Sequence, residues 1–420
     1  MTTATTSLPA ACAAAKRASL ALQTLPSDVK NDALEAIADG LSERAGEVLE
    51  ANAADVLDAR EGEHTSAFLD KLRLDEARVA AMVVGVRQIA ALSDPVGEVI
   101  EGFRLPNGLE VRKVRVPLGV IALVYEARPN VTIDATALCL KSGNAVVLRG
   151  SSAARRSNAA LADIATAAAS CTGLPEDAVT LLQGGRAEIA ELATQTGLID
   201  LIVPRGGEGL KAALKGVATV PVIYAASGNC HVYVDRSADL EQARAIVLNA
   251  KVHRPGVCNA AETVLVHAEI AARFLPEALA ALSEAGVVLH GDDRARAAAP
   301  AAVMKAATDD DWYAEYLALE LAVGVVDSVE EAIAHINAHG SGHSEAIVTR
   351  DTDAARAFEL GVDAACVYVN ASTRFTDGGE FGMGAEIGNS TQKLHARGPI
   401  GIRELCTYKY LVEGAGHVRS

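Results

Sequence analysis

The chain has 420 residues, of which 50% are hydrophobic and 4% aromatic, and its formal net charge is −16. This length exceeds the size at which one hydrophobic core stops growing, so two or three domains are expected, and the composition favours helices packed on parallel sheets. The negative charge, without a basic stripe, disfavours nucleic-acid binding, and no apolar run is long enough to predict a membrane span.

Helical periodicity dominates the first ~95 residues. The N-terminus lacks the basic start of a signal peptide and is typical of an amphipathic helix. Two alternating segments around Pro106-Asn107-Gly108 then predict a β-hairpin over about residues 98–117. Such a hairpin often contacts a neighbouring subunit, although folding onto its own domain is nearly as common.

From Val116 onward, short apolar runs alternate with helical ones. The first set is LGVIALVY, AVVLR, VTLL, LIDLIVP and VPVI, and the second is CHVYVD, TVLVH, VVLH, LAVGVVD, EAIVTRD and ACVYVN. Repeated βα units with continuously apolar strands predict an α/β protein with doubly wound parallel sheets. We place a domain boundary near Ala226–Asn229, which gives domains over 1–228 and 229–372 and a C-terminal segment over 373–420.

Four stretches follow strands of the first set, where a doubly wound sheet binds its ligands. They are YEARPN (125–130), LRGSSA (148–153), LLQGGRAE (181–188) and VPRGGEG (203–209). Glycines before a helix can turn backbone N–H groups toward phosphate, although each stretch taken alone could be an ordinary turn. Together they favour a nucleotide. Arg149 could pair with a phosphate there or could be a surface arginine.

Seven cysteines contain no CxxC pair and no zinc-type spacing, so neither a disulfide framework nor a metal site is expected. A reducing cytoplasm is the expected compartment. Cys258, in KVHRPGVCNAAET, follows a Pro-Gly pair in a loop, which suits a nucleophile that His253 and Arg254 could activate. Cys230, at the start of CHVYVD, is a rival that the pattern alone does not exclude.

Several of these stretches, read together, resemble a known family. They are VPLGVIALVYEARPNVTIDATALCLKSGNAVVLRG, IDLIVPRGGEGL, GNCHVYVD, KVHRPGVCNAAET, INAHGSGHSEAIVT and HARGPIGIRELCTYKY. In this order they resemble the aldehyde dehydrogenase superfamily, and within it the glutamate-5-semialdehyde dehydrogenases. The resemblance implies that 1–228 binds the cofactor and carries the hairpin arm. It also implies that 229–372 is the catalytic domain and that 373–420 closes the site or joins subunits.

The resemblance also implies catalytic and substrate-binding residues. Cys258 matches the nucleophilic cysteine, and Asn130 matches the asparagine whose amide, with the Cys258 backbone N–H, forms the oxyanion hole. Arg374 is our choice for the group that binds the substrate α-carboxylate, with Thr373 nearby. An arginine in an interdomain salt bridge is the alternative for Arg374.

For the cofactor, Arg149 falls where many relatives carry a lysine next to the adenosine ribose. An arginine there suits a 2′-phosphate, so NADPH/NADP⁺ is expected rather than NADH. Gly206 and Gly207 match positions that approach the pyrophosphate and nicotinamide, and Glu315 matches, on a loose local alignment, the glutamate that holds the nicotinamide ribose.

One departure from the family is informative. Aldehyde-oxidising relatives carry a glutamate in an E-L-G-G stretch that activates water, whereas the corresponding stretch here, Ala226–His231, has no carboxylate. Its absence fits an enzyme that ends its cycle with phosphate. The implied reaction is NADPH-dependent reduction of L-glutamate 5-phosphate to L-glutamate 5-semialdehyde and phosphate through a cysteine thioacyl intermediate, in proline biosynthesis.

Two other readings stay open. One is a CoA-acylating aldehyde dehydrogenase of the same superfamily. The other is a protein without nicotinamide chemistry, either a cysteine acyltransferase or a non-catalytic nucleotide-binding protein. A homo-oligomer, dimer or tetramer, is expected from the hairpin and the tail, and a transient contact with a glutamate 5-kinase is left open.

Overall fold

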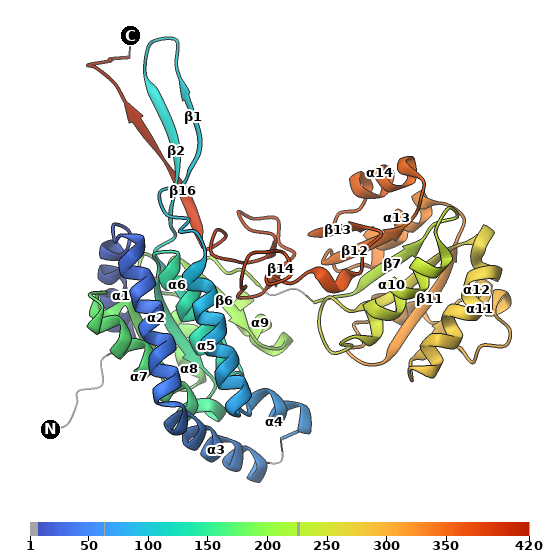
Figure 1. Ribbon diagram of the computed structural model, residues 1–420, viewed down its shortest axis with the longest axis horizontal. Helices are drawn as coiled ribbons and strands as arrows, with labels where there is room; N and C mark the ends of the chain where they lie inside the picture. The colour runs from blue at the N-terminus through green and yellow to red at the C-terminus, as the bar shows by residue number, and fades with distance from the viewer. Residues whose placement is uncertain (1–6, 63, 225–226, 420) are drawn as a thin grey trace. The chain divides into compact units, whose positions relative to one another are not determined.

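The computed structural model describes residues 7–62, 64–224 and 227–419 (Figure 1). The chain divides into two compact units. Unit 1 consists of Met1–Tyr224, Gly382–Gly388 and Ile400–Ser420, and unit 2 consists of Ala225–Phe381 and Asn389–Pro399. Among the described residues, no helix is long and apolar enough to cross a membrane.

The division falls after Tyr224, a few residues before the boundary expected from the sequence. The expected C-terminal segment 373–420 is not a body of its own, because its parts belong to both units. Strand β16 (Cys406–Glu413) pairs with β2 (Glu110–Pro117) of unit 1, whereas the 3-10 turn η4 (Thr373–Phe375) packs on strands of unit 2. Such long-range pairing leaves no local pattern in the sequence.

In the described part of the chain, five helices precede the first strand, as the helical periodicity predicts. They are α1 (Leu8–Leu22), α2 (Ser27–Glu43), α3 (Ala45–Glu61), α4 (Ser66–Leu72) and α5 (Glu76–Ala91). Asp75 begins α5 by accepting a hydrogen bond of 2.9 Å from the Arg78 N–H, which satisfies one free donor of the first turn. α2 packs against α5, α6 and α7, so these helices form layers beside the sheet of unit 1.

The parallel sheet of unit 1 has the strand order β5-β4-β3-β6. Its strands are β3 (Val120–Tyr125), β4 (Ala145–Gly150), β5 (Val179–Leu182) and β6 (Leu201–Arg205), and its helices are α6 (Asn130–Lys141), α7 (Arg155–Cys171), α8 (Arg186–Ala193) and α9 (Glu208–Lys215). β4 and β6 lie on opposite sides of β3, so the strand order reverses between β3 and β6, where doubly wound sheets bind ligands. The run VPVI, predicted as a strand, forms only an isolated bridge between Ile202 and Val222.

The predicted hairpin is confirmed and gains a third strand. β1 (Val99–Arg104) and β2 pair antiparallel, and β16 pairs with the other edge of β2. Figure 1 shows this three-stranded sheet projecting from the helices of unit 1. Its exposed apolar side chains include Val99, Phe103 and Tyr410.

The sheet of unit 2 has seven parallel strands in the order β10-β9-β11-β8-β7-β12-β13. They are β7 (Cys230–Val234), β8 (Ala261–His267), β9 (Val288–Gly291), β10 (Lys305–Ala306), β11 (Glu320–Val326), β12 (Ser344–Val348) and β13 (Cys366–Val369). Both faces carry helices, which confirms the doubly wound class. One apolar core includes residues of α10 (Leu240–Val252), α11 (Ala268–Glu284) and α12 (Asp293–Ala298), and the other includes residues of α13 (Val329–His339) and α14 (Thr352–Gly361).

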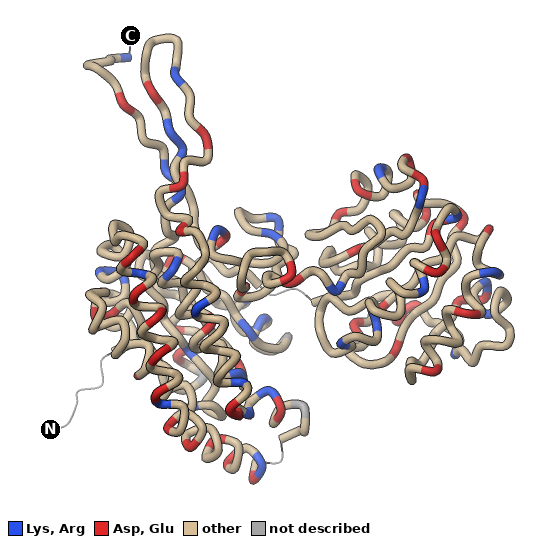
Figure 2. The backbone as a smooth tube through the Cα atoms, viewed as in Figure 1, with Lys and Arg blue, Asp and Glu red and all other residues tan. Residues whose placement is uncertain are grey.

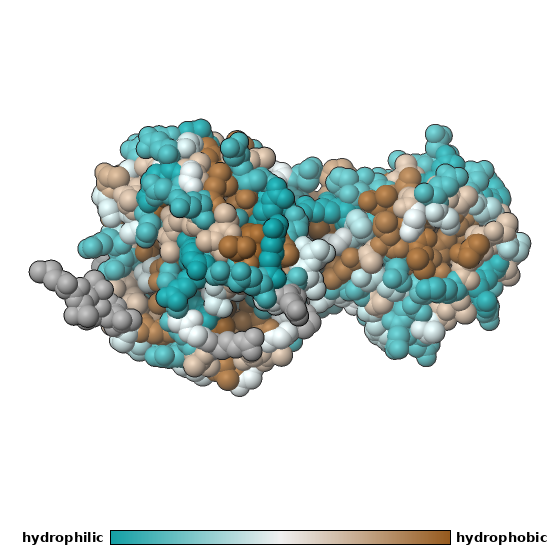
Figure 3. All heavy atoms as spheres, turned by 90° about the horizontal axis from the view of Figure 1, so that it is seen from below, coloured by the Kyte–Doolittle hydropathy of each residue, from teal (hydrophilic) through white to brown (hydrophobic). Residues whose placement is uncertain are grey.

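Short elements complete the fold. They are the 3-10 turns η1 (Ser152–Ala154), η2 (Glu176–Ala178) and η3 (Asp309–Tyr313), and the paired strands β14 (Asn389–Ser390) and β15 (Gly398–Pro399). Figure 2 shows acidic and basic residues interspersed along both units, and Figure 3 shows hydrophilic residues over much of the visible surface with apolar patches between them.

Candidate active site

Cys258 lies in the loop between α10 and β8 of unit 2 and is half-buried. Asp239 begins α10 by accepting hydrogen bonds from the N–H groups of Glu241 and Gln242. The helix ends at Val252, and Pro255 favours the extended backbone that leads the chain away from it. The loop therefore presents its thiol at the amino end of β8, with partial access to solvent.

The backbone of Gly228 passes directly against that of Cys258. A Cβ atom added at Gly228 would lie 1.5 Å from the Cys258 carbonyl oxygen, so only glycine fits this position. The Gly228 N–H donates a hydrogen bond of 2.7 Å to Oε1 of Glu315, which holds the segment in place. This contact fixes the loop around the thiol, and it joins stretches that lie far apart in the sequence.

Cys230, the rival nucleophile, is fully buried. Its Sγ donates a hydrogen bond of 3.2 Å to the carbonyl of Cys258, and burial raises the pKa of its thiol well above the usual range. A thiol that stays protonated and has no access to solvent is a poor nucleophile. Of the two thiols, that of Cys258 is therefore the accessible one, and that of Cys230 is buried and bonded to the Cys258 carbonyl.

Asn259 connects the cysteine loop to the segment after β13. Its Nδ2 donates to the carbonyls of Arg374 and Thr376, at 3.3 and 2.9 Å. The hydroxyl of Thr373 is buried and donates to the carbonyl of Asn259 at 2.7 Å. The structure thus brings the predicted pair Thr373 and Arg374 next to Cys258, with Thr373 engaged in a structural contact.

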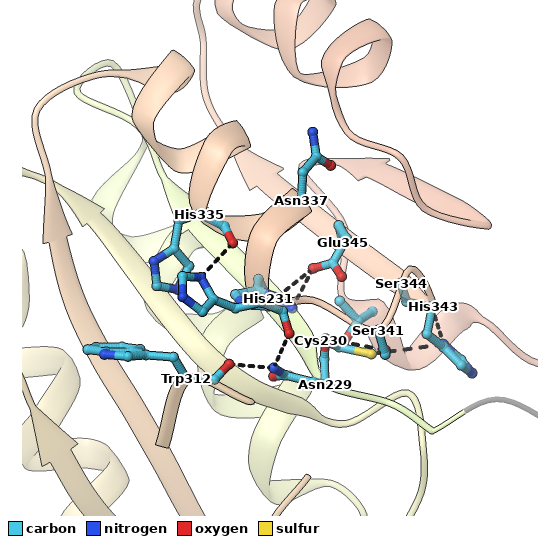
Figure 4. A network of polar contacts seen from close by, with 12 residues as sticks. Asn229, Cys230, His231, Trp312, His335, Asn337, Ser341, His343, Ser344 and Glu345 are labelled. Atoms are coloured by element: carbon cyan, nitrogen blue, oxygen red, sulfur yellow. Dashed lines mark hydrogen bonds and ion pairs between the residues drawn. The ribbon is translucent and has the colours of Figure 1, made fainter. Parts of the chain in front are cut away.

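A series of polar groups extends from Cys230 (Figure 4). His343 Nδ1 lies 3.9 Å from the Cys230 sulfur and 2.7 Å from Ser344 Oγ, which in turn lies 2.5 Å from Thr376 Oγ1. Burial lowers the pKa of His343 to about 4, so the imidazole is neutral near pH 7. His343 is therefore a buried, neutral member of this series of polar groups.

Replacing His343 with asparagine should weaken the dependence of stability on acid pH. The unfolded histidine takes up a proton near pH 6.5, whereas the folded one resists protonation until about pH 4, so its contribution to stability is lost as pH falls from 6.5 toward 4. One such histidine contributes a slope of up to about 1.4 kcal/mol per pH unit. Urea unfolding between pH 7 and 5 measures the difference. The exposed histidine variant His417→Asn serves as the control, and equal slopes in wild type and His343→Asn would refute the assignment.

A second network of polar contacts lies on the opposite side of the same ends of β7 and β12 (Figure 4). His231 Nδ1 contacts Glu345 Oε2 at 2.9 Å, and both side chains are fully buried. Asn229 donates to the carbonyls of Trp312 and His339, at 2.7 and 3.0 Å. These contacts hold the backbone around Asn229, where β7 begins.

A fully buried ion pair connects the two ends of the cysteine loop. Lys251 Nζ, in the last turn of α10, lies 2.5 Å from Glu262 Oε2, and neither side chain is exposed to solvent. Cys230 pairs with Ala261 and His231 with Thr263, so Glu262 is the extra residue of a β-bulge. Burial lowers the pKa of Lys251 and raises that of Glu262 to about 7. The sequence alone did not single out this pair.

In unit 1, Asn130 is the first residue of α6. Its Nδ2 donates a hydrogen bond of 2.8 Å to Asp134 Oδ2, and burial raises the pKa of Asp134 to about 6. A side-chain amide has two N–H donors, so one can be held by Asp134 while the other serves a ligand. Asp134 is thus a residue that orients the predicted oxyanion donor.

Arg149 is buried at the end of β4, where its guanidinium binds the backbone. It donates to the carbonyls of Gly150, Gly184 and Gly185 at 2.8 to 2.9 Å. Its Nε also lies 3.6 Å from Oε2 of Glu188, so the described contacts of Arg149 join the end of β4 to the loop after β5 and to α8. Beside it lies a pocket of about 260 Å³. Its lining includes Gly150, Ser151, Ser152, Arg155, Asn158 and Gln183.

This pocket combines a position at strand ends with a polar lining. It lies at the carboxyl ends of two parallel strands, and its polar lining includes two hydroxyls and the exposed guanidinium of Arg155. A Cβ atom at Gly150 would lie 2.1 Å from Nδ2 of Asn158, so the strand end needs glycine to pass this close to α7. The residues therefore suit a phosphorylated ribose.

Gly206 and Gly207 lie between β6 and α9, at the point where the strand order reverses. The Gly207 N–H donates to Oε2 of Glu126 at 2.9 Å, and a Cβ atom at Gly206 would lie 2.7 Å from that carboxyl group. A carboxylate thus sits at a helix N-terminus of the kind that binds phosphate. Glu126, in YEARPN, is a residue that the sequence alone did not identify.

The family model for the aldehyde dehydrogenase family matches residues 2–309 of the chain. This match covers more than half of the sequence and agrees with the two doubly wound units and the half-buried loop cysteine. The chain belongs to the aldehyde dehydrogenase family.

The relatives are similar over their full length. Gamma-glutamyl phosphate reductase of Thermobifida fusca is 56% identical over 406 residues, which is 96% of this chain and 97% of that protein. The same-named protein of Kineococcus radiotolerans is 55% identical over 421 residues, 100% of this chain and 98% of that one. The crystal structure of gamma-glutamyl phosphate reductase from Thermotoga maritima has a TM-score of 0.95 at 45% identity and covers 98% of this chain and 99% of that chain. Within the family, the chain therefore falls in the branch of the gamma-glutamyl phosphate reductases.

Proposed function

We propose that the chain reduces L-glutamate 5-phosphate to L-glutamate 5-semialdehyde with NADPH and releases phosphate, as a step of proline biosynthesis. The full-length similarity to reductases of that name supports the substrate. The single structural observation that carries the chemistry is the contrast between the half-buried thiol of Cys258 and the fully buried thiol of Cys230.

In this proposal the Cys258 thiolate attacks the acyl carbon of the substrate. A sulfur–carbon bond forms, the carbon–oxygen bond to phosphate breaks, and phosphate leaves with the electron pair, which gives a thioacyl enzyme. The Asn130 amide and the Cys258 N–H stabilise the oxyanion that forms on the way, and a donor in comparable sites contributes about 3–4 kcal/mol. Asp134 holds the Asn130 side chain in one orientation.

A bound nicotinamide would supply a hydride to the thioacyl carbon, after which the carbon–sulfur bond would break, release the aldehyde and return the electron pair to the sulfur of Cys258. Ser151, Ser152 and Arg155 line the pocket proposed for the 2′-phosphate, with Arg149 fixing the loop beside it. Gly206 and Gly207 are proposed for the pyrophosphate end, which requires Glu126 to release the Gly207 N–H.

In this proposal, no side chain acts as a base that activates water for attack on the thioacyl group. The described residues of the stretch that carries the glutamate in aldehyde-oxidising relatives, Ser227–His231, include no carboxylate. The carboxylate of Glu315 reaches this stretch through the Gly228 N–H, so its proposed role toward the nicotinamide ribose would need that hydrogen bond to open or to be shared. The thioacyl group is therefore expected to react with hydride or phosphate and not with water.

The reverse reaction tests the function. NADP⁺ reduction by the purified chain with glutamate 5-semialdehyde should require inorganic phosphate. Coenzyme A in place of phosphate should not support turnover, and its doing so would establish a CoA-acylating aldehyde dehydrogenase. If NADP⁺ is not reduced under any of these conditions, the protein does not carry out nicotinamide chemistry and the proposed function is wrong.

Replacing Arg155 with glutamine should reduce the preference for NADPH over NADH. A hydrogen bond to a charged group contributes about 1.5–3 kcal/mol, so the ratio of kcat/KM for the two cofactors should fall about 10-fold or more. Arg156→Gln is the matched control, because that neighbouring side chain pairs with Asp55 and Asp58 instead. An unchanged ratio in Arg155→Gln would exclude this residue from the 2′-phosphate site.

We also propose that the chain forms a homo-oligomer, a dimer or a tetramer, through the three-stranded arm. The exposed apolar side chains of β1 and β16 support this proposal, since such residues often lie in subunit interfaces.

A further inference from the structure

Two arginines lie in the segments next to Cys258, and the charges of Arg254 and Cys258 both act on Arg374. Arg254 is exposed in the same loop, four positions before the cysteine. Arg374 lies in η4, where Asn259, the residue after Cys258, donates to its backbone carbonyl at 3.3 Å. Both arginines belong to unit 2, and they approach the cysteine loop from two different segments of the chain.

Neither guanidinium is neutralised by the described part of the chain. None of the described residues forms a side-chain hydrogen bond or ion pair with Arg254 or Arg374, and Nε of Arg374 is buried without an acceptor. Arg397 of the same unit also has a buried Nε without an acceptor, but it differs in charge balance because its guanidinium pairs with Asp363 at 3.0 Å. A pair of unneutralised arginines beside a thiol is suited to binding an anion.

The electrostatics of Arg374 support this interpretation. Burial and the nearby positive charge of Arg254 lower the pKa of Arg374, while Asp377 acts in the opposite direction. The Asp377 carboxylate already accepts a hydrogen bond of 2.9 Å from the Gly379 N–H. A negative group placed between two positive charges reduces the repulsion between them.

We propose that Arg254 and Arg374 form the subsite for the phosphate group of the acyl phosphate substrate, and for inorganic phosphate in the reverse direction. This inference rests on the proposed function and specifies which side chains bind its leaving group. The phosphate is bonded to the carbon that Cys258 attacks, whereas the α-carboxylate lies at the far end of the glutamate chain. This assignment therefore replaces the α-carboxylate role that the sequence suggested for Arg374.

The subsite would act on the bond-breaking step. As the sulfur–carbon bond forms, the carbon–oxygen bond breaks and the departing phosphate gains negative charge. Planar guanidinium groups donate paired hydrogen bonds to phosphate oxygens and stabilise that charge where it develops. The same two groups would hold phosphate for attack on the thioacyl carbon when the reaction runs backward.

Steady-state kinetics of the reverse reaction test the subsite. Wild type, Arg254→Gln and Arg374→Gln are compared for the KM of phosphate and the KM of glutamate 5-semialdehyde. Each variant should raise the phosphate KM about 10-fold or more and change the aldehyde KM by less than about twofold. Arg254→Lys and Arg374→Lys keep the charge and should recover part of the loss, and Arg356→Gln, an exposed arginine of α14, should leave both constants unchanged.

A second readout does not need turnover. Inorganic phosphate should protect Cys258 of the wild type from alkylation by iodoacetamide in a saturable way, and this protection should disappear in both glutamine variants. Circular dichroism and the midpoint of thermal unfolding establish that the variants are folded. A glutamine variant that does not fold is replaced in both readouts by the lysine variant of the same arginine.

The possible outcomes separate the two proposals. If the wild type turns over without phosphate, the proposed function fails. If its turnover requires phosphate but the phosphate KM stays within about twofold of wild type in either variant, the paired subsite is overturned and the proposed function stands. If Arg374→Gln raises the aldehyde KM and leaves the phosphate KM unchanged, the α-carboxylate role is correct and the subsite is overturned.

Discussion

Replacing Cys258 with alanine should lower kcat by roughly 10⁴-fold or more, because the thioacyl enzyme cannot form without its sulfur. The effect should appear in both directions of the reaction, measured with NADPH and acyl phosphate or with NADP⁺, aldehyde and phosphate. Binding of NADPH, measured by calorimetry, should be nearly unchanged because the proposed nucleotide pocket lies in unit 1.

Cys230→Ser is the matched control. Serine keeps a donor for the Cys258 carbonyl, which Cys230 binds at 3.2 Å, and removes only the buried thiol. This variant should keep kcat within about 10-fold of the wild type, since a net hydrogen bond is worth about 0.5–1.5 kcal/mol. Activity that survives in Cys258→Ala and is lost in Cys230→Ser would reverse the assignment of the nucleophile.

Replacing Lys251 with methionine should destabilise the protein by about 3–5 kcal/mol, because Glu262 would lose its buried partner. Its pKa, already raised to about 7, would rise further, so that folding near neutral pH would require the carboxyl group to take up a proton. The pair joins the end of α10 to the bulge at the start of β8, so both ends of the cysteine loop should loosen with it. Urea unfolding gives the free energy of unfolding, and the alkylation rate of Cys258 reports on the loop.

The double variant Lys251→Met/Glu262→Leu separates charge from packing. Apolar side chains of similar size can replace a buried ion pair at little cost, so much of the stability lost in Lys251→Met should return. Glu262 also accepts a hydrogen bond from the Leu317 N–H at 3.3 Å, which this variant does not restore. If the double variant is less stable than the single one, the buried pair contributes more than charge compensation.

The fold could largely be predicted from the sequence because its parallel strands are continuously apolar. LGVIALVY and TVLVH are such runs, and they form β3 and β8, which are buried along their whole length. VPVI has the same composition but forms only a bridge, since composition does not report which neighbour a strand finds. The division of the C-terminal segment between two units depends on long-range pairing in the same way.

The candidate site was predictable where one stretch of sequence carries the feature. The Pro-Gly loop around Cys258 is of this kind. The contact of Gly228 with Cys258 could not be predicted in this way. It joins the segments that precede two different strands, and only the folded sheet brings these segments together. The sequence placed Arg149 at the end of a strand, where it does lie, but only the structure shows its guanidinium bound to backbone carbonyls. Glu126 at the start of α9 depends on the folded structure in the same way.

The central claim is that Cys258 carries the acyl group and that phosphate, not water, removes it. The most direct measurement mixes the wild type with glutamate 5-semialdehyde and NADP⁺ in the absence of phosphate, quenches in acid within the first turnovers, and identifies the modified peptide by mass spectrometry. The account predicts a glutamyl group on the peptide that contains Cys258, and its loss when phosphate is added before the quench. Steady turnover without phosphate, or an adduct on the peptide that contains Cys230, would contradict it.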